Sequence, residues 1–126
     1  MWGSNRSKYK AQKTTHKGYS FASKGEANCF DMLTLLERAG EIKIVQLQPQ
    51  VHLTLAKILY KPDFKIHDLK LEQDVYCEFK GFETAEWKIK RRLWEHYGPG
   101  ILRVYRSRGN RIVLTEEIIP STGEIK

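Results

Sequence analysis

Two carboxylates and a lysine lie at a spacing that a β-hairpin can bring together. Asp63 belongs to the run KPDF, and Glu78 and Lys80 belong to the run CEFKG, which places the second acid fifteen positions after the first. Carboxylates gathered on one side of a hairpin repel each other unless a cation lies between them, and hard divalent cations prefer oxygen ligands. A lysine beside such a site suggests phosphate chemistry. These residues therefore predict a metal site that acts on a phosphate group.

The alternation of apolar side chains selects one antiparallel register for this hairpin. The pairs that it predicts are Asp63–Glu78, Phe64–Cys77 and Ile66–Val75. The apolar faces of both strands then coincide, and residues 69–72 remain as a connection of ordinary hairpin length. Directly opposed Cβ atoms lie about 5 Å apart, so the two acids could share one metal ion. The alternative, two exposed polar positions on a half-solvated hairpin, leaves this agreement between register and chemistry unexplained.

A third acid, Glu26, is expected in the first turn of a helix. Ser23 and Glu26 have the spacing of a capping box, and an apolar-periodic segment follows to about Ala39, before Gly40. At 100° per residue, Glu26 falls within the apolar arc of this helix and therefore points inward. Two roles fit equally well, a capping carboxylate or a third acid directed at the hairpin, and one residue can fill both.

The remaining elements are predicted from alternation and from turn residues. Strands are expected at residues 42–48, 51–58, 101–105 and 112–119, and a helix capped by Thr84 at residues 84–97. The apolar arc of the second helix consists of Trp87, Ile89, Leu93, Trp94 and Tyr97. Lys90 lies inside this arc together with Glu86. Either the two form an i,i+4 ion pair, or the lysine reaches over the sheet edge toward the metal site.

The charge distribution favours a polyanionic partner. The 126-residue chain has a formal net charge of +7 and a pI near 9.5. The basic candidates for contacting DNA are Arg6, Lys8, Lys10, Lys13, Lys88, Lys90, Arg91 and Arg92. A basic periphery around a group of carboxylates is what a metal-dependent nuclease needs, because it attracts the polyanion while the centre binds the cation. A merely solvated basic surface is the alternative.

Length and composition predict one domain. Residues 1–20 are polar, basic and without periodicity, so we expect a flexible basic arm followed by a domain over residues 21–126. Neither a run of about 18 apolar residues nor a secretory signal occurs, and we expect no membrane partner and no small-molecule cofactor. Cys29 and Cys77 fall on apolar faces, which is typical of buried thiols and of a reducing, cytoplasmic setting.

The order of these motifs resembles the PD-(D/E)XK nuclease superfamily over residues 23–107. An acidic helix is followed by Pro-Asp at a strand, by Glu-X-Lys one hairpin later and by a basic helix. Within the superfamily the chain is similar to phage Holliday-junction resolvases of the endonuclease I type and to a phage group with a "PDF … EFKG … KIKRRLW" run. The resemblance implies an α/β, restriction-endonuclease-like αβββαβ core, with a mixed central sheet flanked by helices.

The resemblance also implies a role for each site residue. Asp63, Glu78 and the backbone carbonyl of Phe79 would bind Mg²⁺, for which Mn²⁺ is the expected substitute. Glu26 matches the helix-borne acid of these families, and Lys80 would orient or deprotonate the attacking water. The implied catalytic set is therefore Glu26, Asp63, Glu78 and Lys80. Resolvases of this type are homodimers that cut two strands symmetrically, and the resemblance to phage enzymes implies the cytoplasm of a bacterial or phage-infected host cell.

We therefore expect a Mg²⁺-dependent DNA endonuclease that is selective for branched DNA. One alternative is a restriction-type, nicking or transposon-end endonuclease on the same fold. Another is a DNA-binding module without catalysis, although such a module would have no reason to keep all four site residues. The sequence does not choose between DNA structures.

Overall fold

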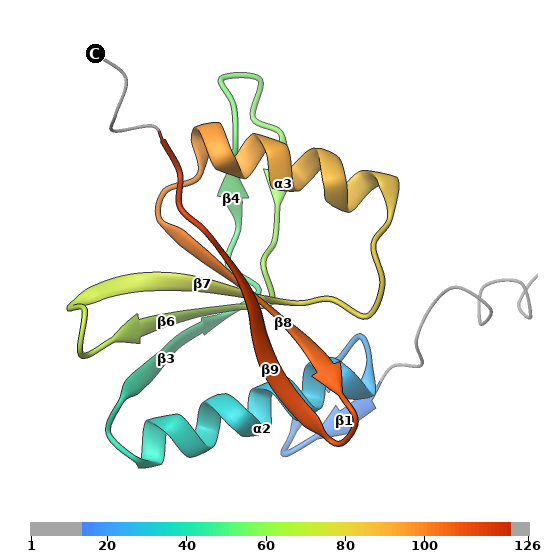
Figure 1. The fold of residues 1–126 in the computed structure, drawn as a ribbon, viewed down its shortest axis with the longest axis vertical. Coiled ribbons are helices and arrows are strands. Elements are labelled where there is room, and N and C mark those ends of the chain that lie inside the picture. Colours follow the sequence, from blue (N-terminus) through green and yellow to red (C-terminus); the bar gives the residue numbers. More distant parts are fainter. Residues whose placement is uncertain (1–13, 122–126) are drawn as a thin grey trace, which may run out of the picture.

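A five-stranded mixed sheet forms the centre of the molecule (Figure 1). The structure is a computed structural model and describes residues 14–121. In spatial order the strands are β3 (Ile42–Leu47), β6 (Phe64–Asp68), β7 (Gln73–Phe79), β8 (Ile101–Arg108) and β9 (Arg111–Ile118). β7 and β8 run parallel, whereas the other neighbours are antiparallel. The predicted strands that became β3, β6, β7, β8 and β9 are confirmed.

Two helices of the described chain cover opposite faces of this sheet (Figure 1). They are α2 (Lys24–Arg38) and α3 (Ala85–Tyr97). α2 begins where the Ser23 hydroxyl accepts the backbone N–H of Glu26 at 3.0 Å. α3 begins where the Thr84 hydroxyl accepts the backbone N–H of Trp87, also at 3.0 Å. Both predicted helix starts are confirmed, and neither helix is long and apolar enough to cross a bilayer.

Each face of the sheet has its own hydrophobic core. On the α2 side, buried side chains from the helix meet Phe64, Ile66, Val75 and Cys77, whereas Tyr76 points to the α3 side and packs there with Trp87 and Trp94. Burying one such side chain stabilises the fold by about 1.5–3 kcal/mol. The end of the hairpin that carries Glu78 is therefore covered on both faces, so Glu78 is not the exposed polar position of the half-solvated alternative. Cys29 and Cys77 are buried free thiols as predicted, and burial raises the pKa of Cys77 to about 12.

The hairpin of β6 and β7 has the predicted register. Phe64 pairs with Cys77 and Ile66 pairs with Val75, with residues 69–72 as the connection. Asp63 lies one residue before β6, so a ladder pair between Asp63 and Glu78 does not form. The chain bends at Asp63 instead, which leaves its side chain available for a contact with the end of β7.

The prediction of one strand over residues 51–58 is wrong. In its place a short hairpin joins β4 (Val51–His52) to β5 (Leu59–Tyr60), outside the central sheet and beside α3 (Figure 1). Lys57 has a φ of 59°, and its backbone N–H donates to the Thr54 carbonyl at 2.8 Å. This tight turn reverses the chain where the apolar pattern had predicted a continuous strand, because periodicity carries no information about a turn made by ordinary residues.

The prediction of a flexible arm over residues 1–20 is wrong for residues 14–20. β1 (Thr14–His16) and β2 (Tyr19–Phe21) form an antiparallel hairpin that packs on α2, and Phe21 belongs to the core. Gly18 has a φ of 83°, which suits the two-residue turn between the strands. Three aromatic residues stabilise this docking, since the rings of Tyr19 and Phe21 lie 5.4 and 5.2 Å from that of Phe30. The rest of the predicted arm lies outside the described residues.

The apolar arc predicted for the second helix is broader than the buried face of α3. Trp87 and Trp94 are buried and Leu93 is partly buried, whereas Ile89 and Tyr97 are more than half exposed. A helix that lies on a sheet buries a stripe rather than half its circumference, so residues at the edges of a sequence-derived arc remain in solvent.

Candidate active site

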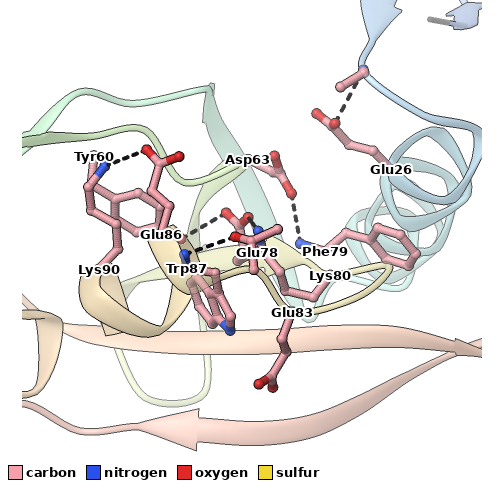
Figure 2. A network of polar contacts seen from close by, with 12 residues as sticks. Glu26, Tyr60, Asp63, Glu78, Phe79, Lys80, Glu83, Glu86, Trp87 and Lys90 are labelled. Carbon is pink, nitrogen blue, oxygen red and sulfur yellow. Dashed lines mark hydrogen bonds and ion pairs between the residues drawn. The ribbon is translucent and has the colours of Figure 1, made fainter. Parts of the chain in front are cut away.

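The four predicted catalytic residues line one cavity of about 550 Å³ at an end of the sheet (Figure 2). Glu26 comes from the first turn of α2, Asp63 from the bend before β6, and Glu78 and Lys80 from the end of β7. The hairpin register and the helix start, both readable in the sequence, bring these residues together. The other residues of the cavity wall are Ala22, Ser23, Lys24, Gly25, Phe79, Gly81, Phe82, Thr84 and Ser107.

Asp63 is held by hydrogen bonds to two different strand ends. Its carboxylate accepts the backbone N–H of Phe79 at 2.7 Å, and its carbonyl accepts the backbone N–H of Gln48 at 2.8 Å (Figure 2). Gln48 has a φ of 50°, a conformation that non-glycine residues adopt uncommonly. The backbone of Gln48 therefore helps to position a predicted metal ligand.

Glu78 has a fixed orientation because each of its oxygens has a partner. Oε1 accepts the hydroxyl of Tyr60 at 2.8 Å, and Oε2 lies 3.2 Å from Nζ of Lys80. The Tyr60 ring is itself held by Trp87 and Trp94, at centroid distances of 6.2 and 5.8 Å. Sequence reasoning missed Tyr60, because its place depends on the β4–β5 hairpin packing against α3. Its position three residues before Asp63 was the one available signal.

Glu26 combines the two roles that the sequence left open. Its side chain is 5% exposed and lines the cavity, as the inward direction predicted. Its Oε1 also accepts the backbone N–H of Ala22 at 3.3 Å, which satisfies a donor next to the helix start. Figure 2 shows the Asp63 carboxylate between those of Glu26 and Glu78.

The Lys80 ammonium lies between Glu78 and an aromatic ring. Its Nζ is 4.8 Å from the centroid of Trp87, at a distance typical of a cation–π contact. Lys90 makes the i,i+4 pair with Glu86 at 3.5 Å and donates to the Leu59 carbonyl at 3.1 Å. Lys90 therefore contacts these groups rather than the site carboxylates. It lines a second cavity of about 200 Å³ that Lys80 shares.

Burial and mutual repulsion make the carboxylates of this site unfavourable as a set. Desolvation raises the pKa of Asp63 well above its usual value, and the charges of Glu78 and Glu26 raise it further. Burial likewise raises the pKa of Glu78, against the opposing effects of Lys80 and Tyr60. The pKa of Glu26 is also raised by burial. One lysine does not compensate three acids, so the cavity favours the arrival of additional positive charge.

These donors suit Mg²⁺ in number and type. Among residues 14–121, no group of three or more His, Cys, Asp and Glu side chains is close enough together to hold a metal ion by itself. Mg²⁺ does not require such a cage, because it is usually bound by one or two carboxylates with the remaining positions taken by water and substrate phosphates. Asp63 and Glu78, which lie close together at the end of β7, supply the two carboxylates that such a site requires.

The predicted DNA-binding residues divide into three groups. Lys88 and Arg92 are exposed on α3 and are free to approach a phosphate chain. Arg91 is not a free cation, because its guanidinium pairs with Glu95 at 2.8 Å and also contacts Glu116. Lys90 is paired as well, as described above, and the assignment of both residues as DNA ligands stays a prediction. Arg6, Lys8, Lys10 and Lys13 lie outside the described residues.

Two helix starts reach the cavity. Ser23, Lys24 and Gly25 contribute the beginning of α2, and Thr84 contributes the beginning of α3. The N-terminus of a helix carries a partial positive charge, and an anion near it is stabilised. A phosphate that enters the cavity would therefore find Lys80 and two helix starts in its wall.

The fold and the cavity define a mixed α/β protein with a buried acidic site. A family model described as "Protein of unknown function (DUF1064)" matches residues 6–112, so the chain belongs to this family. No curated protein and no solved structure matches the chain.

Proposed function

We propose that this protein is a Mg²⁺-dependent DNA endonuclease with a restriction-endonuclease-like fold of the PD-(D/E)XK type. The observation that carries the proposal is the convergence of Glu26, Asp63, Glu78 and Lys80 on one cavity. The element order α2-β3-β6-β7-α3-β8, with helices on both faces of a mixed sheet, supports the fold. Buried carboxylates beside a lysine are costly for stability, which favours a chemical role over a structural one.

In this proposal the metal ligands are Asp63, Glu78 and the Phe79 carbonyl, with Glu26 as a further acid. Bound Mg²⁺, or Mn²⁺ in its place, supplies positive charge that offsets the carboxylates and polarises the scissile phosphate. The donor set is the support for this assignment, since it consists of oxygen atoms alone and leaves positions for water and phosphate.

The remaining groups orient and stabilise the reacting atoms. Lys80, held by Glu78 and the Trp87 ring, orients the attacking water and offsets the charge that develops on the phosphate. Tyr60 fixes the rotamer of Glu78, so the carboxylate does not have to reorganise during the reaction. The starts of α2 and α3 bind the phosphate through their N-terminal dipoles.

DNA is the proposed partner, and branched DNA is the proposed substrate, cut by a homodimer. A net charge of +7 supports attraction to a polyanion, and Lys88 and Arg92 are available for phosphate contacts near α3. Symmetric cutting of a junction needs two active sites, which is the reason for proposing a dimer.

The test is cleavage of a four-way junction, a plain duplex and a single strand in Mg²⁺. Asp63→Asn and Lys80→Ala should each lower the cleavage rate by about 10²-fold or more, because each removes a group that acts on the reacting atoms. DNA binding, measured by gel shift, should remain, since affinity comes mainly from the basic residues. Asp74→Asn is the matched control, because Asp74 lies on β7 with a half-exposed side chain outside the cavity.

Cleavage that persists in Asp63→Asn and Lys80→Ala would contradict the assignment of the site. Binding of DNA by the wild-type protein without cleavage in Mg²⁺ or Mn²⁺ would instead favour the non-catalytic DNA-binding module.

A further inference from the structure

Phe82 is an exposed aromatic residue at the rim of the proposed active site. Its side chain is 58% exposed and lines the same cavity as Asp63 and Lys80. Single exposed apolar residues are normal on protein surfaces, and exposure alone would mean little. The position of Phe82 is different, because its exposed aromatic side chain borders the cavity that holds the site carboxylates and Lys80.

The connection that carries Phe82 is anchored on both sides of it. Before it, the backbone N–H of Lys80 donates to the Tyr105 carbonyl at 2.9 Å, which extends the pairing of β7 with β8. After it, the Glu83 carboxylate accepts a hydrogen bond from the Arg106 guanidinium at 2.8 Å. Thr84 then caps α3. The loop that carries Phe82 therefore has fixed ends and keeps the ring exposed to solvent. A ligand that stacks on the ring would lose little conformational entropy in ordering this loop.

The site carboxylates lie at a different depth from Phe82. Glu26 and Glu78 are 5% and 6% exposed, so a phosphate must enter the cavity to reach them. B-DNA, whose major groove alone is about 12 Å wide, cannot enter a cavity of about 550 Å³. A single strand can, because its backbone is flexible and its bases are free to turn outward.

An unpaired base next to the scissile phosphate would meet the Phe82 ring. Nucleobases stack on aromatic side chains, and this contact tolerates any base because every base has a π-face. In a duplex the same face is covered by the neighbouring base pairs. The cavity therefore offers buried groups that can act on a phosphate and an exposed aromatic side chain that can stack on a base.

We propose that Phe82 stacks on an unpaired base beside the scissile phosphate, and that the substrate of this site is single-stranded or locally unpaired DNA. The inference rests on the proposed function and names the substrate class within it. Phe82 acts as a specificity-determining residue, whereas the carboxylates and Lys80 perform the chemistry.

The test compares binding of a fluorescein-labelled single-stranded oligodeoxynucleotide and of the duplex of the same sequence, with Ca²⁺ in place of Mg²⁺. Phe82→Ala should weaken single-strand binding roughly 5- to 150-fold, the range for loss of one base–aromatic stack, and should leave duplex binding nearly unchanged. Phe82→Trp should retain single-strand binding. Tyr97→Ala is the matched control, because Tyr97 is 53% exposed at the end of α3 and does not line the cavity.

Three results would overturn the inference, and only the last of them also overturns the proposed function. If the wild-type protein cleaves DNA and Phe82→Ala binds single strands as Tyr97→Ala does, the stacking role fails while the proposed endonuclease stands. An equal loss for duplex and single strand has the same meaning, since it removes the preference for unpaired bases. If the wild-type protein neither binds nor cleaves any of these DNAs, the proposed function fails and the inference fails with it.

Discussion

The hydrogen bond from Tyr60 to Glu78 is the contact at the residue scale that distinguishes this site from a simple cluster of acids. A buried tyrosine hydroxyl normally finds a partner, and here the partner is a carboxylate at 2.8 Å. Burial raises the pKa of Tyr60, and the negative charge of Glu78 raises it further, so the hydroxyl remains a donor at all ordinary pH values. In the proposed reaction Tyr60 is therefore a positioning residue, which acts through Glu78.

We expect Tyr60→Phe to destabilise the fold by about 1.5–3 kcal/mol, the usual worth of a hydrogen bond to a charged group. Cleavage should fall about tenfold with single-stranded DNA binding retained, because Glu78 loses the contact that fixes its rotamer. Urea unfolding and the cleavage assay measure the two effects. Tyr76→Phe is the control, since Tyr76 is buried against the same Trp94 ring. Equal effects of both variants on cleavage would contradict a specific role for the Tyr60 hydroxyl.

At the scale of elements, the start of α2 is fitted against the end of β7. A Cβ atom at Gly25 would fall inside the ring of Phe79, whose backbone N–H holds Asp63. The next residue in the helix is Glu26. A glycine at this position therefore permits the close approach that brings the acid of α2 next to the acids of the hairpin.

We expect Gly25→Ala to lower stability and cleavage together, although alanine is the better helix former by about 1 kcal/mol. The added methyl group must displace Phe79 or the first turn of α2, and overpacking of this kind costs about 1–3 kcal/mol. Thermal unfolding and the cleavage rate test this prediction. Gly81→Ala is the control for thermal unfolding alone, since a Cβ at Gly81 meets open space but Gly81 lines the cavity. Unchanged stability in Gly25→Ala would show that the close approach of α2 to β7 is not required.

At the scale of the whole molecule, Asp68 connects the end of β6 to the far side of the sheet. Its Oδ1 accepts the backbone N–H groups of Lys70 and Leu71 in the hairpin connection, at 3.0 and 2.9 Å. Its Oδ2 accepts a hydrogen bond from the guanidinium of Arg103 in β8 at 3.0 Å. The same guanidinium donates to the carboxylate of Glu117 in β9 at 2.8 Å. This network joins three strands at the end of the sheet opposite to the cavity.

The network predicts a pH dependence of stability. Burial acts to raise the pKa of Asp68, but the hydrogen bonds from Leu71 and Arg103 outweigh it, so the pKa is below the usual value of about 3.9. Stability from a lowered carboxyl pKa is complete above the unfolded-state pKa and is lost as the pH falls through the folded-state pKa. Wild-type protein should therefore lose this contribution below about pH 4.

We expect Asp68→Asn to cost about 1–3 kcal/mol at neutral pH and progressively less as the pH falls below about 4. The measurement is the free energy of unfolding in urea for both proteins across this pH range. A difference between them that stays constant with pH would contradict the ionised role of Asp68. Because the network is remote from the cavity, DNA cleavage at neutral pH should be unaffected where the variant is folded.

Local physics explains which parts of the fold could be predicted. Helix starts depend on a hydroxyl three residues before a backbone N–H, as at Ser23 and Thr84, and strand register depends on alternation, as at Phe64 and Cys77. The β4–β5 hairpin could not be predicted, because its turn contains neither glycine nor proline and its apolar residues fit a strand equally well. For the same reason the contacts of Tyr60, which depend on this hairpin, were missed.

The sequence by itself determined that Asp63, Glu78 and Lys80 would converge, because the register of one hairpin brings them together within a short stretch of chain. It also determined that Glu26 would point inward from α2. The tertiary structure alone decided that these groups share one cavity with Phe82, that Tyr60 orients Glu78, and that Arg91 and Lys90 are already paired. These contacts join residues from separate elements, and their distances depend on how two helices and a short hairpin pack on the sheet rather than on any local pattern.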